Sequence, residues 1–420
     1  MPSDKNYLFC NFSIGLSMVL VASLLGCERE KSSSAIPPIK INQIQVLGTH
    51  NSYSLEVDTA VLNYIDPIVA QMMEPMLQSL PPEKLAEFNE NHPHGMSLKE
   101  GLQYAHPPFE IQLNAGIRSL EIDVYYDPEG GRFADPAAYR FLRSTGLTDL
   151  LPYDTTGLHE PGFKVLHIAD VDFRTNYTTL SRALHAIRTW SEEHPGHGPL
   201  FILIEVKDSG FPLFPGAAPI EKFDTAVFDA LDREILEVLG REKVITPDDV
   251  RGDFTTLREA VRANNWPTLE EARGKCLFLL LPETGGGKGK TSDYIARHPV
   301  LKDRVMFIQS DPEDDFAAFL LLDNAIIRQA EIQAYVQAGY LVRTRADIET
   351  YEAKVNDYTR ADAAFSSGAQ IVSTDFFKAG NTYGTEYVVR LPGGNELRPN
   401  PVNAQNGGGT PSEPSAEHRE

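Results

Sequence analysis

The sequence predicts a (β/α)8 TIM barrel, an α/β fold in which eight parallel strands alternate with helices. The first observation is that eight short apolar runs, rich in branched side chains, recur along the chain. Continuous apolar runs of this kind are typical of strands buried on both faces, as in a parallel sheet. The second is that segments with helical periodicity lie between most of these runs. The third is the length of the folded part, about residues 40–390, which suits one barrel.

The strands and helices are expected to alternate along the chain. Strands are predicted at residues 41–48, 116–124, 163–168, 200–206, 275–281, 304–309, 340–345 and 370–376. Helices are predicted at residues 178–194, 224–240, 314–339 and 347–368. The connection between the first two strands is long and carries an insertion at residues 62–88. In the first helix Leu184, Ile187 and Trp190 share one face, and the second ends on Gly240, a residue typical of helix C-termini.

The N-terminal residues 1–26 are interpreted as a lipoprotein signal peptide. Residues 8–25 are almost continuously apolar, and "LLGC" at 24–27 resembles a lipobox in which Cys27 becomes the lipidated residue. The alternative is a transmembrane anchor, because 18 residues are just enough to span a bilayer. The polar residues 27–39 that follow are typical of a tether, which favours the lipoprotein. We therefore expect an exported protein, either a lipoprotein of the bacterial cell envelope, in the outer membrane, or a secreted one.

The other end of the chain, residues 391–420, is rich in Gly, Pro, Asn and Ser and lacks apolar periodicity, so a disordered tail is predicted. The TIM-barrel domain that carries the candidate catalytic residues is then expected at residues 40–390. Only three cysteines are present, and Cys276 alone lies in that domain. The domain therefore has no pair for a disulfide and too few cysteines for a typical zinc site.

The net charge of −21 indicates which partners to exclude. Nucleic acid is excluded as a partner because phosphate binding requires a basic surface. Electrostatic docking on an anionic membrane is excluded for the same reason. An acidic chain is nevertheless suited to surrounding a cation with carboxylates.

Polar side chains follow the first four predicted strands, where a barrel carries its chemistry. They are His50 and Asn51, Glu121 and Asp123, His167, and Glu205. Glu121 and Asp123 are two residues apart, so a strand directs both to one face. Carboxylate and amide oxygens form the ligand set that Ca²⁺ prefers, and two histidines beside a cation suit phosphodiester cleavage.

A structural explanation exists for each of these residues taken alone. A histidine at a strand end is commonly only hydrogen-bonded, a Glu-x-Asp pair can be salt-bridged, and Glu205 can pair with Lys207. The convergence of six such residues on one end of successive strands favours a site.

Four segments in this order carry a resemblance to a known family: "GTHNSY" (48–53), "GIRSLEIDV" (116–124), "FKVLHIADVDF" (163–173) and "LFILIEVKD" (200–208). The chain resembles the X-region of calcium-dependent phosphatidylinositol-specific phospholipase C, in the bacterial secreted branch of the PLC-like phosphodiesterase superfamily, over about residues 41–380. The resemblance implies a set of Ca²⁺ ligands and two catalytic histidines. The ligands are Asn51, Glu121, Asp123 and Glu205, and the histidines are His50 and His167.

The reaction that the resemblance implies is cleavage of phosphatidylinositol to diacylglycerol and inositol phosphate through a cyclic phosphate. Ca²⁺ would bind the inositol 2-hydroxyl and a phosphate oxygen, and Glu121 or Glu205 would take the hydroxyl proton. His50 would donate to the phosphoryl oxygen, and His167 would protonate the departing diacylglycerol oxygen. The expected partners are thus a phospholipid or another phosphodiester, and a membrane reached through the lipid anchor.

Four basic residues are candidates for binding the substrate: Lys207, Arg343, Arg345 and Lys288. Arg343 and Arg345 are two apart on one strand, and either hold phosphate or pair with the carboxylates. Eukaryotic relatives carry lysines near the end of the fifth strand for ring phosphates. Here only Lys288 and Lys290 lie nearby, in "TGGGKGKT" (284–291), which favours an unphosphorylated inositol lipid or another headgroup.

Two other functions stay open at this point. Glycerophosphodiester phosphodiesterase has a similar barrel, but that family opens with His-Arg-Gly where this chain has His-Asn-Ser-Tyr. The second is a non-catalytic surface lipoprotein that binds calcium or another ligand. The presence of both histidines and all three carboxylates disfavours a barrel that has lost its activity.

Overall fold

The computed structural model describes residues 38–404 apart from residue 211 and residues 282–292. Several sequence predictions lie outside the described residues and stay predictions. They are the signal peptide at 1–26, lipidation of Cys27, the tether up to residue 37, Lys288, and the tail beyond residue 404. Among the helices that the structure describes, none combines the length and apolar character needed to cross a membrane.

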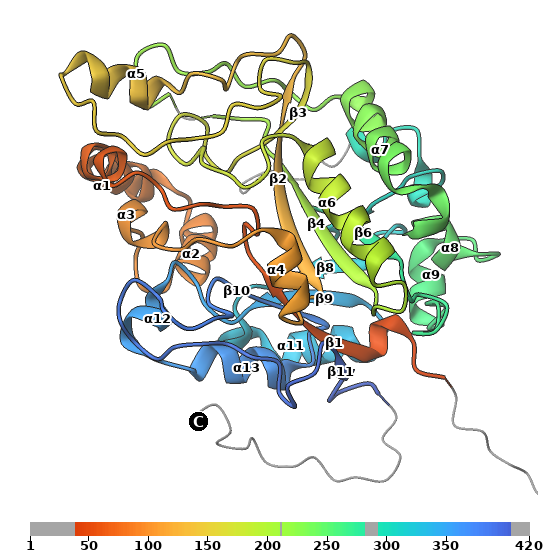
Figure 1. The fold of residues 1–420 in the computed structure, drawn as a ribbon. Helices are drawn as coiled ribbons and strands as arrows, with labels where there is room; N and C mark the ends of the chain where they lie inside the picture. Colours follow the sequence, from red (N-terminus) through yellow and green to blue (C-terminus); the bar gives the residue numbers. More distant parts are fainter. Residues whose placement is uncertain (1–37, 211, 282–292, 405–420) are drawn as a thin grey trace, which may run out of the picture. The chain divides into compact units, whose positions relative to one another are not determined.

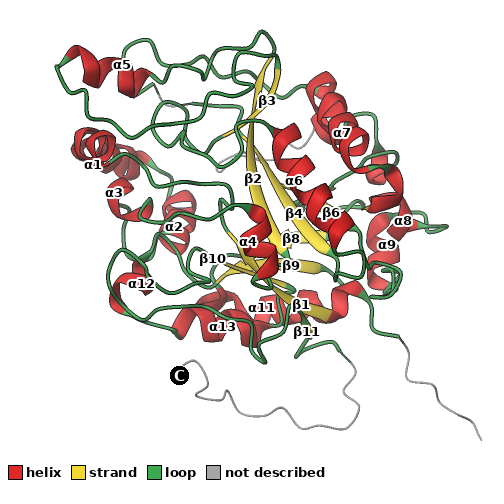
Figure 2. Ribbon diagram, viewed as in Figure 1, coloured by secondary structure: helices red, strands yellow, loops and turns green. Residues whose placement is uncertain are grey.

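Eight parallel strands form the predicted barrel (Figures 1 and 2). They are β1 (Ile44–Thr49), β2 (Ser119–Asp127), β4 (Leu200–Val206), β6 (Cys276–Leu281), β7 (Phe307–Ile308), β8 (Phe319–Leu321), β9 (Leu341–Arg345) and β10 (Ile371–Thr374). Parallel pairing runs from β8 through β9, β10, β1, β2, β4 and β6 to β7. A parallel bridge between Gln309 and Phe319 joins β7 to β8 and closes the ring. The predicted (β/α)8 fold is confirmed.

Two of the predicted elements are wrong. The run at 163–168 forms β3 (Gly162–Val165), which pairs antiparallel with the outer half of β2, from Val124 to Asp127, and is not a barrel strand. The missing barrel strand is β8, which lies inside the helix predicted at 314–339. A strand of three residues has no periodicity of its own, so only its pairing with β9 distinguishes it from the start of the following helix.

The helices lie around the outside of the strands, and four helices fill the connection between β1 and β2 (Figure 1). Those four are α1 (Thr59–Ser79), α2 (Pro82–Asn91), α3 (Leu98–Gly101) and α4 (Phe109–Asn114). The others are α5 (Ala137–Ser144), α6 (Leu180–Glu193), α7 (Thr225–Leu239), α8 (Pro247–Arg251), α9 (Leu257–Arg262), α11 (Ala325–Gln337), α12 (Tyr351–Val355) and α13 (Thr359–Ser367). Three short 3-10 helices lie at Ile41–Gln43, Arg241–Lys243 and Pro299–Leu301.

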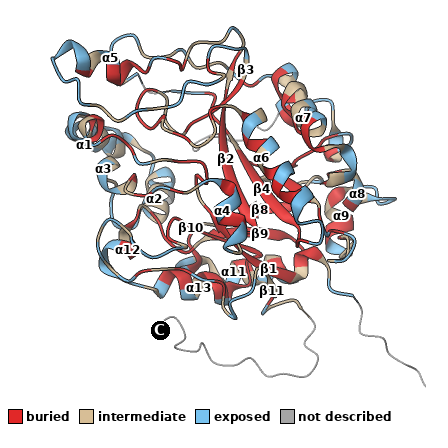
Figure 3. Cartoon of the chain, viewed as in Figure 1, coloured by how far each residue is buried: buried red, intermediate tan, exposed pale blue. Residues whose placement is uncertain are grey.

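The local sequence explains where the helices α6 and α7 begin and where α7 ends. Thr179 and Asp224 cap α6 and α7 by accepting hydrogen bonds from the first-turn amides. Gly240 follows α7 with φ of +85°, a backbone conformation that favours glycine. The side chains of Leu184, Ile187 and Trp190 are buried on the face of α6 predicted from the sequence. Figure 3 shows that the barrel strands themselves are buried almost throughout.

The chain continues to pack against the barrel beyond residue 390. The short strand β11 (Arg398–Pro399) pairs antiparallel with the start of β1, and the Arg398 guanidinium donates to Gln45 Oε1 at 2.8 Å. Asn400 is buried and donates to the Gly368 carbonyl at 2.6 Å. The prediction of a disordered tail is therefore wrong for residues 391–404. Gly and Pro are frequent there because the segment turns along the barrel surface, and its few buried groups show no periodicity.

Candidate active site

The turn after β1 is the first part of the site. Gly48 is required there because a Cβ at this position would lie 2.7 Å from the Ser119 Cβ on β2. After Thr49 the chain turns through Asn51, whose φ is +44°. Ser52 fastens the turn to β2: its amide donates to the Glu121 carbonyl at 3.0 Å, and its Oγ accepts from the Glu121 amide at 2.8 Å. The turn thus holds His50 and Asn51 next to β2.

Three carboxylates meet beside this turn, as predicted from their positions on the strands. Glu121 and Asp123 lie on β2, and Glu205 is the direct neighbour of Asp123 in the β2–β4 register. One oxygen of each lies within 4.8 Å of the others, a spacing that allows one metal ion to bind all three. Burial, with the negative charge of its two neighbours, raises the pKa of Glu121 to about 8, although Arg343 opposes the shift. Burial likewise raises the pKa of Asp123 to about 6.

Two buried oxygens in this cluster form neither a hydrogen bond nor an ion pair within the described part of the chain. One is Asp123 Oδ1 and the other is Asn51 Oδ1. The Asn51 amide nitrogen donates to the Tyr104 hydroxyl at 2.6 Å, which fixes the amide so that its oxygen stays free. A buried anionic oxygen without a partner is costly unless a cation binds it. Together with Glu121 and Glu205, these side chains form a set of four oxygen ligands that fits Ca²⁺, which prefers oxygen.

A lysine and an arginine side chain also lie next to the three carboxylates. The Lys207 ammonium lies 2.9 Å from Asp123 Oδ2 and 2.7 Å from Glu205 Oε1. Arg343 lies 2.8 Å from Glu121 Oε2 and also pairs with Asp323. Lys207 and Arg343 are therefore paired with carboxylates, which is one of the two alternatives that the sequence left open. Their role in substrate binding stays a prediction.

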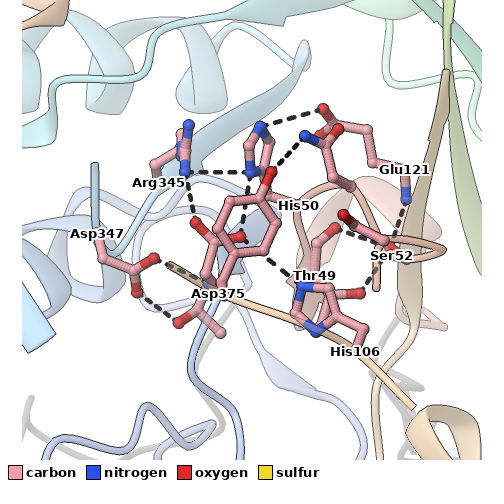
Figure 4. A network of polar contacts seen from close by, with 12 residues as sticks. Thr49, His50, Ser52, His106, Glu121, Arg345, Asp347 and Asp375 are labelled. Carbon is pink, nitrogen blue, oxygen red and sulfur yellow. Dashed lines mark hydrogen bonds and ion pairs between the residues drawn. The ribbon is translucent and has the colours of Figure 1, made fainter. Parts of the chain in front are cut away.

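His50 is held by groups from the last two strands (Figure 4). Its Nδ1 lies 3.0 Å from Asp375 Oδ1, after β10, and 3.3 Å from an Arg345 nitrogen on β9. Its Nε2 lies 3.8 Å from Glu121 Oε1. Burial, followed by the positive charge of Arg345, lowers the pKa of His50 to about 3, although Asp375 opposes this. Burial works against the ionisation of Asp375 too, but His50 and Arg345 outweigh it and place the pKa of Asp375 below its usual value.

His167 approaches the cluster from the segment after β3, with its ring centroid 6.5 Å from that of His50. Its Nδ1 lies 2.9 Å from Asp172 Oδ2. Burial lowers the pKa of His167, but the hydrogen bond and the charge of Asp172 outweigh burial, so the pKa lies above its usual value. Asp123 adds to this rise. The two histidines therefore have pKa values shifted in opposite directions.

The structure thus brings together all six residues predicted from the strand ends and adds three that the sequence reasoning missed. Asp375 directly follows the last barrel strand and was detectable by the same argument as His50. Asp172 lies five residues after His167, within a segment already recognised as a motif. Tyr104 comes from the insertion between β1 and β2, and nothing in its local sequence points to the site.

The chain is similar to known proteins in sequence and in fold. Residues 39–401 match the family model described as phosphoinositide phospholipase C, Ca²⁺-dependent. The fold is similar to that of a calcium-dependent phosphoinositol-specific phospholipase C from a Gram-negative Pseudomonas species, at 14% identity and a TM-score of 0.49, covering 86% of this chain and 95% of that one. A Ca²⁺-dependent phosphatidylinositol-specific phospholipase C from Streptomyces antibioticus is 17% identical with a TM-score of 0.45, over 80% and 95% of the two chains.

No curated protein sequence matches the chain. The family model alone spans well over half of the 420 residues, from Ile39 at the start of the barrel domain to Pro401 just after β11. On that match, the chain belongs to the Ca²⁺-dependent phosphoinositide phospholipase C family.

Proposed function

We propose that this protein is a Ca²⁺-dependent phospholipase C that cleaves phosphatidylinositol to diacylglycerol and an inositol phosphate, through a cyclic phosphate. The observation that carries the proposal is the pair of histidines beside the carboxylate cluster. Each has an aspartate at its Nδ1, which leaves its Nε2 for chemistry, and their pKa values are shifted apart. Such a pair suits an acid and a base working on one substrate.

The cation would be held by Asn51, Glu121, Asp123 and Glu205. When bound, Ca²⁺ lowers the pKa of a coordinated hydroxyl and neutralises charge that develops on the phosphate. The two arginines on β9 add to this neutralisation. The Nε groups of Arg343 and Arg345 are buried and, within the described residues, have no acceptor, so they are available to a phosphate oxygen.

His50 is assigned the role of base. A carboxylate only accepts hydrogen bonds, so the neutral imidazole donates its Nδ1 proton to the ionised Asp375 and keeps a lone pair on Nε2. That lone pair accepts the proton of the inositol 2-hydroxyl as its oxygen bonds to phosphorus. This assignment differs from the one that the family resemblance implied, in which Glu121 or Glu205 takes the proton and His50 donates. One oxygen of Glu121 is already paired with Arg343, and the carboxylate would also be a ligand of the cation, so its oxygens are engaged elsewhere.

His167 is assigned the role of acid, as the resemblance implied. Asp172 favours the protonated form of its imidazole by raising its pKa. As the bond between phosphorus and the diacylglycerol oxygen breaks, Nε2 of His167 gives its proton to that oxygen. The step forms one P–O bond, breaks another and moves one proton onto and one proton off the protein. Opening of the cyclic phosphate by water uses the two histidines in exchanged roles.

The test is hydrolysis of a panel of phosphodiesters by the full chain, with calcium and with a chelator. We expect calcium-dependent release of diacylglycerol from phosphatidylinositol, detected together with a cyclic inositol phosphate. A preference for glycerophosphoinositol or glycerophosphocholine would contradict the proposal in favour of a glycerophosphodiester phosphodiesterase. Calcium binding without turnover of any phosphodiester would favour the non-catalytic alternative.

Variants assign the residues. His167→Ala is expected to lose activity by about 10²–10⁴-fold while keeping its circular dichroism spectrum, because it removes a general acid. Glu121→Gln is expected to weaken calcium binding and catalysis together. His185→Ala, at an exposed position of α6, is the matched control and is expected to keep full activity.

A further inference from the structure

Lys207 occupies an unusual place for a lysine. It directly follows β4, and its side chain is only 9% exposed. Among the described residues it forms ion pairs with two carboxylates alone, those of Asp123 and Glu205. Both belong to the set that would bind Ca²⁺. The ammonium thus neutralises the same pair of carboxylates that the ion requires.

We propose that Lys207 is a built-in competitor of calcium that sets the Ca²⁺ affinity of the site. The inference deepens the proposed function and depends on it only for the assignment of Asp123 and Glu205 as ligands. In the absence of the ion, the ammonium stabilises the two carboxylates. When the ion binds, the ammonium gives up these contacts or stays beside a divalent cation.

Both outcomes weaken calcium binding. If the ammonium moves away, the loss of its two charge-assisted contacts opposes binding of the ion. If it stays, it lies within about 5 Å of the ion, since Ca²⁺ binds carboxylate oxygens at about 2.3–2.6 Å. At an effective dielectric constant of about 20, repulsion between charges of +1 and +2 at that distance lowers affinity by well over tenfold.

The lysine is not needed to hold the carboxylates in place. Asp123 is fully buried on β2, and the register of β2 and β4 sets it beside Glu205. Arg343 differs from Lys207 in this respect, because it pairs with Asp323 as well as with Glu121 and so keeps a partner when an ion binds. Lys207 therefore differs from Arg343 in that both of its carboxylate partners would also be ligands of calcium. Once displaced, its ammonium is free for a phosphate oxygen, which agrees with its predicted role in substrate binding.

The experiment is isothermal titration calorimetry, in which the full chain is titrated with CaCl₂ in the absence of substrate. Lys207→Met removes the charge and keeps an unbranched side chain of similar length. We expect its Kd for Ca²⁺ to be at least about tenfold smaller than that of the wild type. Lys207→Gln, which is neutral but keeps a hydrogen-bond donor for the carboxylates, is expected to tighten binding in the same direction and serves if the Met variant does not fold.

Two further variants complete the design. Lys207→Arg keeps the charge and is expected to leave the Kd near the wild-type value. Lys354→Met changes the net charge of the chain equally, at an exposed lysine paired with Glu100, and is also expected to change nothing. An unchanged or larger Kd in both neutral variants of Lys207, or no calcium binding by any of the proteins, would overturn the inference.

The failure of this inference is distinguishable from that of the proposed function, because calcium binding is measured without lipid. Tighter binding in the neutral variants of a chain that cleaves no phosphatidylinositol would refute the proposed function alone. At saturating calcium, Lys207→Met is expected to raise the KM for phosphatidylinositol while the Kd for calcium falls. A residue with only a structural role would not shift the two constants in opposite directions.

Discussion

His50 and His167 are the same amino acid in the same site, yet their neighbours give them opposite tendencies to hold a proton. His50 is buried next to Arg345, and a second cation beside a buried imidazolium is unfavourable, so its pKa falls to about 3. For His167 the charge of Asp172 outweighs burial, and its pKa rises. A proton donor and a proton acceptor are thereby available at the same pH.

Asp172→Asn is expected to lower the pKa of His167, because it removes the charge that raises it. The activity of His167 as an acid is lost as pH rises through its pKa, so the alkaline limb of the profile of kcat/KM against pH should move to lower pH. We expect a shift of about one unit or more, since one pKa unit corresponds to about 1.4 kcal/mol, the order of a charge-assisted hydrogen bond. Asp154→Asn, at an exposed aspartate paired with Arg182, is the control. An alkaline limb that stays in place would show that Asp172 does not act through His167.

At the scale of elements, the site depends on β1, β2 and β4 lying side by side with a defined register. The pairing of Asp123 with Glu205 follows from that register, and the turn after β1 is fastened to β2 through Ser52. β3 is an antiparallel extension of β2 that carries His167 to the same end of the barrel. β11 reinforces the opposite end of β1.

The segment that carries β11 is expected to contribute to stability despite its loop-like composition. Asn400→Ala removes a buried side chain that donates to the Gly368 carbonyl and accepts from the Val402 amide at 2.9 Å. The free energy of unfolding is expected to fall by about 1–3 kcal/mol, because the buried carbonyl and the part-buried amide lose their partner. Denaturant unfolding followed by circular dichroism measures the change. Asn395→Ala, at an exposed position of the same segment, should behave as the wild type, and equal stability of the two variants would contradict the packing described for β11.

For the whole molecule, the cluster of buried carboxylates makes stability depend on pH, and the proposed binding of calcium there is expected to change that dependence. The pKa values of Glu121 and Asp123 in the folded chain, about 8 and about 6, lie above their ordinary values. Between the ordinary and the raised pKa the folded state binds more protons than the unfolded state. These two groups therefore lower stability as pH rises from about 4 to about 8 in the absence of calcium.

Calcium is expected to raise the melting temperature, and by more at pH 8.5 than at pH 5.5. The ion binds the ionised carboxylates and therefore competes with protons, and binding to the folded state alone stabilises it by mass action. Differential scanning fluorimetry at the two pH values, with CaCl₂ and with a chelator, measures the two increments. In Glu121→Gln both the increment and its dependence on pH should shrink. An increment that is the same at both pH values would contradict binding at this cluster.

The sequence alone determined the class of the fold, and it predicted the six polar residues that the structure brings together and the type of cation they suit. These were predictable because apolar runs mark buried strands, and parallel strands of a barrel end on one rim, where their polar residues meet. The same local signals misassigned β3 and β8. An apolar run does not show whether its strand pairs parallel or antiparallel, and a three-residue strand such as β8 cannot be told from the start of a helix until its pairing with β9 is known.

Only the tertiary structure decided which groups act on those six residues. Asp375 lies 325 residues from His50 along the chain, and Arg343 lies 222 residues from Glu121. Contacts over such separations leave no pattern within a short window of sequence, because they follow from the closure of the barrel. The sequence likewise left open whether Lys207 binds substrate or pairs with carboxylates. The register of β2 and β4 places Asp123 and Glu205 side by side, and the ammonium of Lys207 contacts both.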